Sequence, residues 1–195
     1  MRDGSAEEGP GRAPGARGGL GWSIQRSEVV EETRLFVLTR QWARAADGAV
    51  HDFLVLAMPD WVQIVALLSD GRFVMVEQFR HGTRRVTLEF PAGIVESGET
   101  PLQCAVRELE EETGYVAGAG EVVGRVDPNA ALQDNELFIV VLRDCEPMGE
   151  VRQDPRERIR TRIVDPDELD GLIERGEFRD AYGIIAWDFY RRHLG

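Results

Sequence analysis

Apolar residues recur in short runs along most of the chain, and the length of these runs predicts strands. Two of them, at 62–68 and 72–79, are joined by Ser69-Asp70-Gly71, a tight-turn sequence that favours a hairpin. A third, at 158–164, alternates strictly, so that Ile159, Thr161 and Ile163 are expected to face a core. Strands are expected at 34–43, 52–58, 62–68, 72–79, 86–90, 121–126, 136–142 and 158–164.

Three segments have the spacing and end signals of helices, near 101–113, from Asp165 onward and at about 180–194. Strands mixed with few helices predict an α+β fold, an α/β/α sandwich with a mixed sheet. Before it, residues 22–60 form a separate N-terminal antiparallel β region, and residues 61–195 form the main domain. Residues 1–21 are rich in glycine and are expected to be a disordered tail.

Composition narrows the classes of function. The formal net charge of −12 and the pI near 4.8 disfavour nucleic-acid binding, because no overall positive field attracts a phosphate backbone. Two cysteines, Cys104 and Cys145, are too few for a disulfide scaffold and are expected to be reduced packing residues. No apolar stretch is long enough to span a membrane, and none at the N-terminus suits a signal peptide. A cytoplasmic protein is expected.

The helix at 101–113 has clear ends. Thr100 is a good N-cap, Pro101 suits the first helical position, and Gln103 completes a capping box. Gly114 suits the left-handed position that follows a helix. Helical spacing predicts one buried face, formed by Leu102, Ala105, Val106 and Leu109.

Four carboxylates lie at the C-terminal end of this helix, where they repel the helix dipole and one another. The i, i+3, i+4 spacing places Glu108, Glu111 and Glu112 on one face, whereas Glu110 points elsewhere and is expected to face solvent. A solvated acidic surface would explain such a helix. However, the glycines and proline of 89–99 shape a loop beside the acids, and a hard divalent cation such as Mg²⁺ would remove their repulsion.

These residues resemble a known family. The segment from Gly93 to Tyr115 is similar to the Nudix box of the Nudix hydrolases at every defined position. The matching residues are Gly93, Glu99, Arg107, Glu108, Leu109, Glu111, Glu112, Gly114 and Tyr115. The resemblance implies the Nudix fold and metal-dependent hydrolysis of a nucleoside diphosphate linked to another moiety, with Mg²⁺ as the cofactor and Mn²⁺ as an alternative.

The resemblance also implies roles for individual residues. Glu108, Glu111 and Glu112 would be metal ligands, with Glu111 and Glu112 the most central, and the carbonyl of Ala92 a further ligand. Glu99 and Arg107 would pair or would orient the loop and the helix. The base that activates water often comes from a loop after the box, here 146–158. In that loop Glu157 is the first candidate, and Asp154 and Glu150 are the next.

The stretches 77–82 and 88–99 are similar to the Nudix enzymes that cleave ADP-ribose and other nucleoside diphosphate sugars, and residues 176–184 resemble the end of that subgroup. By that resemblance Arg80 and Glu89 lie at the substrate, although a surface salt bridge would also explain Arg80. The loop 127–136 carries Pro128 where a substrate contact is expected, but Pro128 is placed early and no glycine follows it. GDP- and UDP-hexoses therefore stay open as substrates.

Two other functions compete with this one. A Nudix-like sensor that binds a nucleotide metabolite without cleaving it would normally have lost acids of the box, and this chain keeps them all. A house-cleaning hydrolase of oxidised nucleoside triphosphates is disfavoured by the long β region before the box. By resemblance, that region, residues 22–60, would make the protein a homodimer with a small-molecule substrate.

Overall fold

The computed structural model describes residues 20–194, and its internal contacts divide the chain into two units. Unit 1 ends at Leu56 and unit 2 begins at Ala57, slightly before the boundary expected at residue 61. Of the tail expected at 1–21, residues 1–19 lie outside the described residues. Within residues 20–194, no helix is both long and apolar enough for a membrane crossing.

Unit 1 is a three-stranded sheet in the order β1-β2-β3, formed by β1 (Trp22–Glu32), β2 (Val37–Ala45) and β3 (Val50–Ala57). β1 and β2 pair antiparallel. The prediction missed β1 because its polar and apolar residues do not alternate regularly, and the pairing with β2 contains two register irregularities. Ala43 is the only described residue of this unit that is buried, so the sheet has almost no core of its own.

Unit 2 is built on a seven-stranded mixed sheet with the order β10-β5-β4-β9-β8, in which β6 pairs with β5 and β7 with β4. β4 and β9 run parallel, and the other pairs are antiparallel. The strands are β4 (Trp61–Leu67), β5 (Phe73–Arg80), β6 (Arg85–Glu89), β7 (Ala92–Ile94), β8 (Ala119–Val126), β9 (Leu137–Arg143) and β10 (Ile159–Val164). The expected hairpin of β4 and β5 is confirmed, with Gly71 at a φ of 85° in its turn.

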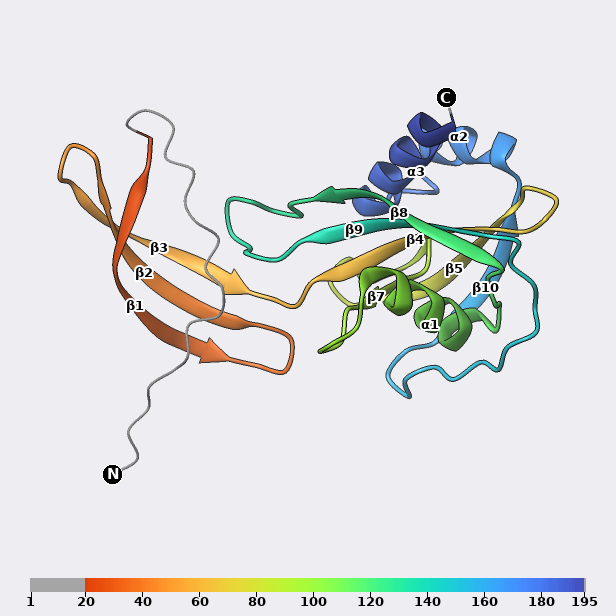
Figure 1. Ribbon diagram of the computed structural model, residues 1–195, viewed down its shortest axis with the longest axis horizontal. Helices are drawn as coiled ribbons and strands as arrows, with labels where there is room; N and C mark the ends of the chain where they lie inside the picture. The colour runs from red at the N-terminus through yellow and green to blue at the C-terminus, as the bar shows by residue number, and fades with distance from the viewer. Residues whose placement is uncertain (1–19, 195) are drawn as a thin grey trace. The chain divides into compact units, whose positions relative to one another are not determined.

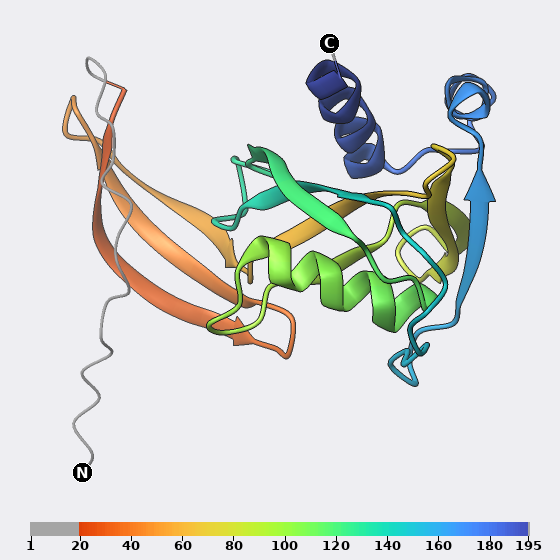
Figure 2. The same cartoon turned by 45° about the vertical axis from the view of Figure 1, so that its right-hand side comes forward.

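Helices cover both faces of this sheet, which confirms the α/β/α sandwich (Figures 1 and 2). They are α1 (Pro101–Thr113), α2 (Pro166–Glu174) and α3 (Ala181–Leu194). Val65 and Leu67 of β4 face a core that α2 and α3 cover, whereas Ile64 and Ala66 face a core that α1 covers. Because β4 is buried on both faces, its sequence is an almost continuous apolar run.

The helix α1 has the ends that the sequence predicts. Thr100 and Gln103 form the capping box, and Gly114 closes the helix in the left-handed conformation at a φ of 73°. The predicted buried face needs one correction: Val106 is 37% exposed, whereas Cys104 is fully buried beside Ala105 and Leu109. The helix is therefore rotated so that Cys104 faces the sheet.

Two smaller differences concern the edges of the sheet. β7 was expected to be loop, but its three residues pair with β4. Ile159, Thr161 and Ile163 of β10 are only half-buried, because β10 is an outer strand with β5 as its partner. Arg160 and Arg162, on the opposite face of β10, form ion pairs with Glu77.

Candidate active site

The acidic end of α1 lies against β7, and a glycine allows this close approach. Gly93 pairs with Val62 of β4 and faces the Glu108 side chain. A Cβ atom at Gly93 would lie 2.0 Å from both Cγ and Cδ of Glu108, which is far inside a normal contact. Position 93 therefore has to be glycine if Glu108 is to keep this position.

Arg107 connects α1 to the loop before it. Its Nε and Nη2 donate to the two carboxylate oxygens of Glu99, both at 2.9 Å, and Nη2 also donates to the Ile94 carbonyl at 3.1 Å. Its Nη1 lies 2.8 Å from Glu108 Oε1 and 3.2 Å from Glu111 Oε2. The side-chain hydrogen bond from Arg107 lowers the pKa of Glu99, and that bond in turn raises the pKa of Arg107. The expected pairing of Glu99 and Arg107 is thus present.

Glu112 is the most unusual of the carboxylates. It is only 6% exposed, and its Oε2 is buried without a hydrogen-bond partner. Burial raises its pKa well above the usual value, and the negative charges of Glu108 and Glu157 raise it further. A hydrogen bond from the Ala92 backbone and the charge of Arg80 act in the opposite direction. Burial also raises the pKa of Glu108.

The donor set of this region suits Mg²⁺, because it consists of carboxylate oxygens, one of them buried and unpartnered, beside the Ala92 backbone. Among residues 20–194 no three side chains of His, Cys, Asp or Glu are already arranged around one point. Glu108 and Glu111 instead direct an oxygen at Arg107. A cation would have to draw these two carboxylates away from the guanidinium.

The loop between β9 and β10, residues 144–158, is attached to the end of α1. The backbone N–H groups of Gly149 and Arg152 donate to the carbonyls of Gly114 and Glu111, at 3.0 and 2.8 Å. Gln153 Nε2 donates to the carbonyls of Glu112 and Ile159, both at 3.0 Å, and Gln153 Oε1 accepts from the Ile159 N–H. These bonds hold the loop that carries the candidate bases beside the acidic helix.

Glu157, the first candidate base, is exposed and lies near enough for its charge to raise the pKa values of Glu108 and Glu112. Asp154 forms an ion pair with Arg156 at 2.5 Å, and Glu150 is exposed.

Glu110 differs from its prediction. It points away from the other three acids, but it is half-buried and not solvent-facing. Its Oε1 lies 3.1 Å from Arg152 Nη2, and its Cγ would lie 2.6 Å from a Cβ at Gly149. The loop 144–158 covers this flank of α1, which helical spacing alone cannot indicate.

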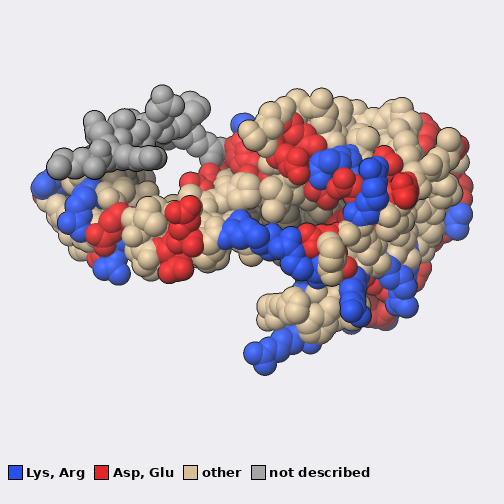
Figure 3. All heavy atoms as spheres, turned by 90° about the horizontal axis from the view of Figure 1, so that it is seen from below, with Lys and Arg blue, Asp and Glu red and all other residues tan. Residues whose placement is uncertain are grey.

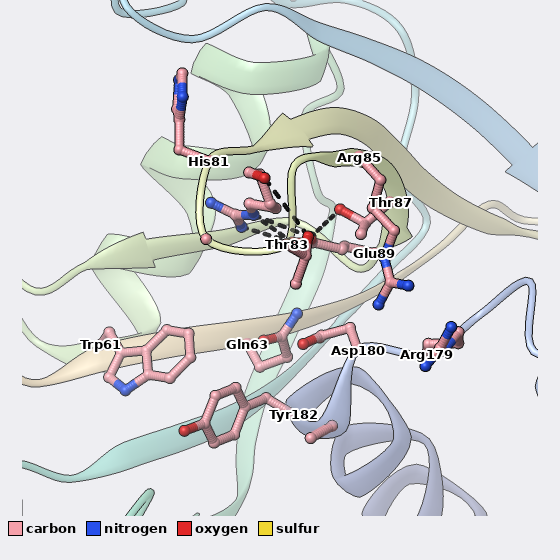
Figure 4. Close-up of a pocket in the computed structure, with 13 residues that line it drawn as sticks. Trp61, Gln63, His81, Thr83, Arg85, Thr87, Glu89, Arg179, Asp180 and Tyr182 are labelled. Atoms are coloured by element: carbon pink, nitrogen blue, oxygen red, sulfur yellow. Dashed lines mark hydrogen bonds and ion pairs between the residues drawn. The ribbon is translucent and has the colours of Figure 1, made fainter.

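A pocket of about 540 Å³ is lined by residues of β4, β5 and β6 and of the segment that leads into α3 (Figure 4). Arg80 and the buried Glu89 form a bidentate ion pair in it, with Arg80 Nη2 2.5 Å from Glu89 Oε2. Thr87 Oγ1 donates to Glu89 Oε1 at 2.5 Å. Arg80 thus forms the expected salt bridge and also lines the pocket, and its contact with a substrate stays a prediction. The charge of Arg80 also lowers the pKa of Glu112 on α1.

Several residues of this pocket were not among the predicted site residues. Trp61 and Tyr182 form an edge-to-face pair with their ring centroids 4.8 Å apart, and Asp180 lies between them and Arg179 in Figure 4. They come from β4 and from the start of α3, so no local pattern joins them. The resemblance of residues 176–184 to the end of the ADP-ribose subgroup is a signal in the sequence that links the start of α3 to the site.

Pro128 is not brought to this pocket. It is half-buried in the loop between β8 and β9 and does not line the cavity that Arg80 and Glu89 share. Pro128 directly precedes a turn that is closed by hydrogen bonds from the Leu132 and Gln133 N–H groups to the Asn129 carbonyl.

Comparison with known proteins identifies the family. The model of the NUDIX domain matches residues 59–187, which include the whole of α1 and the pocket. The chain belongs to the Nudix family. An ADP-ribose pyrophosphatase of Bacillus subtilis is 31% identical over 133 residues, which cover 68% of this chain and 72% of that protein.

Two further relatives cover more of the Nudix chain. The ADP compounds hydrolase NudE of Escherichia coli is 24% identical over 88% of this chain and 92% of its own length. A crystal structure of an ADP compounds hydrolase superimposes with a TM-score of 0.82 at 22% identity, covering 92% of this chain and 97% of that one. The chain thus has the Nudix fold and is a Nudix hydrolase.

Proposed function

We propose that this Nudix hydrolase cleaves the diphosphate linkage of ADP-ribose or a related nucleoside diphosphate sugar, giving a nucleoside monophosphate and a sugar phosphate. The observation that carries the proposal is the pocket of Arg80 and Glu89 beside the buried carboxylate of Glu112. Relatives named as ADP-ribose pyrophosphatase and ADP compounds hydrolase support the same substrate class.

Glu108, Glu111, Glu112 and the Ala92 carbonyl would hold Mg²⁺, with Mn²⁺ as an alternative. The ion would neutralise the phosphate charge and lower the pKa of water. Arg107 and Glu99 keep α1 and the preceding loop together, so that a cation could draw these oxygens towards one point. The unpartnered Oε2 of Glu112 supports this assignment, because a buried anionic oxygen without a donor is destabilising unless a cation occupies the site.

Glu157 is the proposed general base. It takes a proton from the attacking water as the new oxygen–phosphorus bond forms and the bond to the bridging oxygen breaks. Two features support it: its charge reaches Glu108 and Glu112, and Gln153 ties its loop to the Glu112 backbone. An exposed position gives Glu157 access to solvent water.

The pocket suits a nucleoside. Trp61 and Tyr182 offer aromatic surface to a base, and the carboxylates of Glu89 and Asp180 can accept hydrogen bonds from ribose hydroxyls. Arg80 lines the pocket and its charge acts on Glu112, so it can donate to a phosphate oxygen of a substrate bound at both. Pro128 stays a proposed contact to the second moiety of the substrate, from the loop between β8 and β9.

We further propose a cytoplasmic homodimer that binds neither nucleic acid nor membranes. The sheet of unit 1 exposes apolar side chains that need a partner surface, such as Ile24 and Val29. On the face of unit 2 drawn in Figure 3, acidic and basic side chains are interspersed and form no extended basic surface. Together with the net charge of −12, this disfavours a nucleic-acid partner.

A substrate panel tests the activity. The protein and Mg²⁺ are incubated with ADP-ribose, GDP-mannose, UDP-glucose, NADH, diadenosine polyphosphates and 8-oxo-dGTP, and the products are separated by chromatography. We expect ADP-ribose or another nucleoside diphosphate sugar to give the highest kcat/KM. Turnover confined to 8-oxo-dGTP would contradict the proposal, and binding without turnover of any compound would favour a sensor.

A further inference from the structure

Two arginine side chains without an ionic partner lie at one end of the pocket. Most arginines of unit 2 pair with a carboxylate, for example Arg80 with Glu89 and Arg162 with Glu77. Among the described residues of unit 2, four arginines have no such partner, namely Arg84, Arg85, Arg158 and Arg179. Arg85 and Arg179 both line the pocket, and Arg84 precedes Arg85. In a protein with a net charge of −12, this local excess of positive charge requires an explanation.

Arg85 and Arg179 line both this pocket and a second, neighbouring pocket. The second pocket has a volume of about 320 Å³ and adjoins the first through Arg85, Thr87 and Arg179. Its two acidic side chains are already neutralised, since Glu77 pairs with Arg160 and Arg162, and Glu177 pairs with Arg175. Neither acid is therefore available to the two shared arginines.

The backbone at both arginines is held in place. Arg85 begins β6, directly after a turn in which the Arg84 N–H donates to the Arg80 carbonyl at 2.8 Å. Arg179 lies between the fully buried Phe178 and Asp180, which accepts from the Gly183 N–H at the start of α3. The two guanidinium groups are thus presented by fixed elements, and only their side chains need to adjust to a ligand.

The order of groups along the pocket indicates which part of a nucleotide would reach these arginines. Figure 4 shows Trp61 and Tyr182 at one end, Arg85 and Arg179 at the other, and Asp180 between them. A ribose held near Asp180 and Glu89 has substituents in three directions: its base, its 5′ oxygen, and its 2′ or 3′ oxygen. If the base lies on the aromatic rings and the 5′ oxygen points towards Glu112, the 2′ or 3′ oxygen points towards Arg85 and Arg179.

We propose that Arg85 and Arg179 form a binding site for a phosphomonoester on the nucleoside ribose, so that the enzyme prefers nucleoside diphosphate derivatives with a second phosphate at the 2′ or 3′ position. The guanidinium groups donate charge-assisted hydrogen bonds to the phosphate oxygens. This inference rests on the proposed function, because it assumes that a nucleoside occupies the pocket.

Binding to the full chain tests the site without turnover. Calorimetric titration with Mg²⁺ present compares AMP with adenosine 2′,5′-bisphosphate and adenosine 3′,5′-bisphosphate. We expect one bisphosphate to bind about tenfold more tightly than AMP, the size expected for hydrogen bonds to a charged group. Arg85→Ala and Arg179→Ala should each remove most of this ratio. Arg192→Ala, which removes an exposed arginine paired with Asp188 on α3, should keep it.

Equal affinity for AMP and both bisphosphates would overturn the inference, as would a ratio that survives both arginine variants. Inorganic phosphate is titrated in parallel. If the two variants abolish phosphate binding but no bisphosphate preference exists, the arginines bind a free anion and the inference is wrong. Hydrolysis of ADP-ribose by the same preparation separates the two proposals. If ADP-ribose is hydrolysed but no bisphosphate is preferred over AMP, only this inference is wrong. If a bisphosphate is preferred but ADP-ribose is not hydrolysed, only the proposed activity is wrong.

Discussion

Glu112 combines two properties that a folded protein normally avoids in one residue. Its carboxylate is buried with an unpartnered oxygen, and two other carboxylates, Glu108 and Glu157, act on it electrostatically. Arg80 compensates only in part. A side chain of this kind destabilises the fold, and proteins usually keep such a cost at functional sites, which makes Glu112 the sharpest test of the metal site.

The first prediction compares Glu112 with its neighbour Glu110. Glu112→Gln should lower Mg²⁺-dependent kcat by about a hundredfold, since a divalent ion contributes several kcal/mol to such a reaction. Glu110→Gln should change kcat little, because Glu110 pairs with Arg152 on the other flank of α1. Steady-state kinetics over a range of Mg²⁺ concentrations measures both. Equal losses in the two variants would rule out the assignment of Glu112.

Helical spacing was sufficient to separate Glu108, Glu111 and Glu112 from Glu110, because that division depends only on the helix period. The environment of each acid was not predictable. Glu110 meets Arg152, which comes from a loop 42 residues further along the chain. Trp61 and Tyr182 likewise come together only when α3 packs on the sheet. Contacts of this range depend on the tertiary fold, and no local motif describes them.

At the scale of elements, α3 depends on Asp180. Its carboxylate accepts from the Gly183 N–H at 2.7 Å, and its carbonyl accepts from the Ile184 N–H, which makes it the N-cap of the helix. Burial raises the pKa of Asp180, and the charge of Glu89 adds to this, whereas the hydrogen bond from Gly183 lowers the pKa. Asp180 therefore stabilises the end of the helix, while the burial of its carboxylate disfavours the charged form.

Two substitutions separate these effects. The folded state holds the Asp180 proton more tightly than the unfolded chain, so the free energy of unfolding falls as pH rises from about 3.9 through the raised pKa. Asp180→Asn keeps a good N-cap and should remove this part of the pH dependence. Asp180→Ala also loses the cap and should be less stable than Asp180→Asn by about 1 kcal/mol. Urea unfolding between acid and neutral pH measures both, and parallel pH profiles for wild type and Asp180→Asn would contradict the prediction.

Gln153 holds the loop 144–158 to α1 and β10. Gln153→Ala removes its bonds to Glu112 and Ile159, and we expect kcat to fall about tenfold because the loop that carries Glu157 loses its position. KM should change much less. The control is Arg152→Ala, which removes an exposed ion pair but leaves the Arg152 N–H bond to Glu111. A change in KM alone would assign Gln153 to substrate binding.

The elements with clear end signals were predicted most accurately. α1 has its expected bounds because Thr100, Pro101 and Gly114 specify both ends by local chemistry. β1 and β7 were missed for the opposite reason. β7 has three residues and exists only because β4 pairs with it, and β1 has no regular alternation since the sheet of unit 1 buries almost nothing.

At the scale of the whole molecule, unit 1 lacks a core. A three-stranded sheet is stable only if one face is covered, yet Ile24 and Val29 of β1 are 54% and 62% exposed. A homodimer would cover these residues. Ile24→Glu and Val29→Glu should therefore shift the protein towards monomer in light scattering, whereas Val122→Glu, at an exposed apolar position of β8, should not. A wild-type monomer at micromolar concentration would contradict the proposed dimer.

The two cysteines of unit 2 have a practical consequence. Both thiols are buried and unpaired, and burial raises the pKa of Cys104 to about 12 and that of Cys145 to about 11. Alkylating reagents attack the thiolate, so neither sulfur should react in the native protein near neutral pH. Cys104 lies on α1, where its thiol contacts the Ile94 carbonyl. Its alkylation rate would therefore report how often the helix that carries the acids separates from the sheet, without any added label.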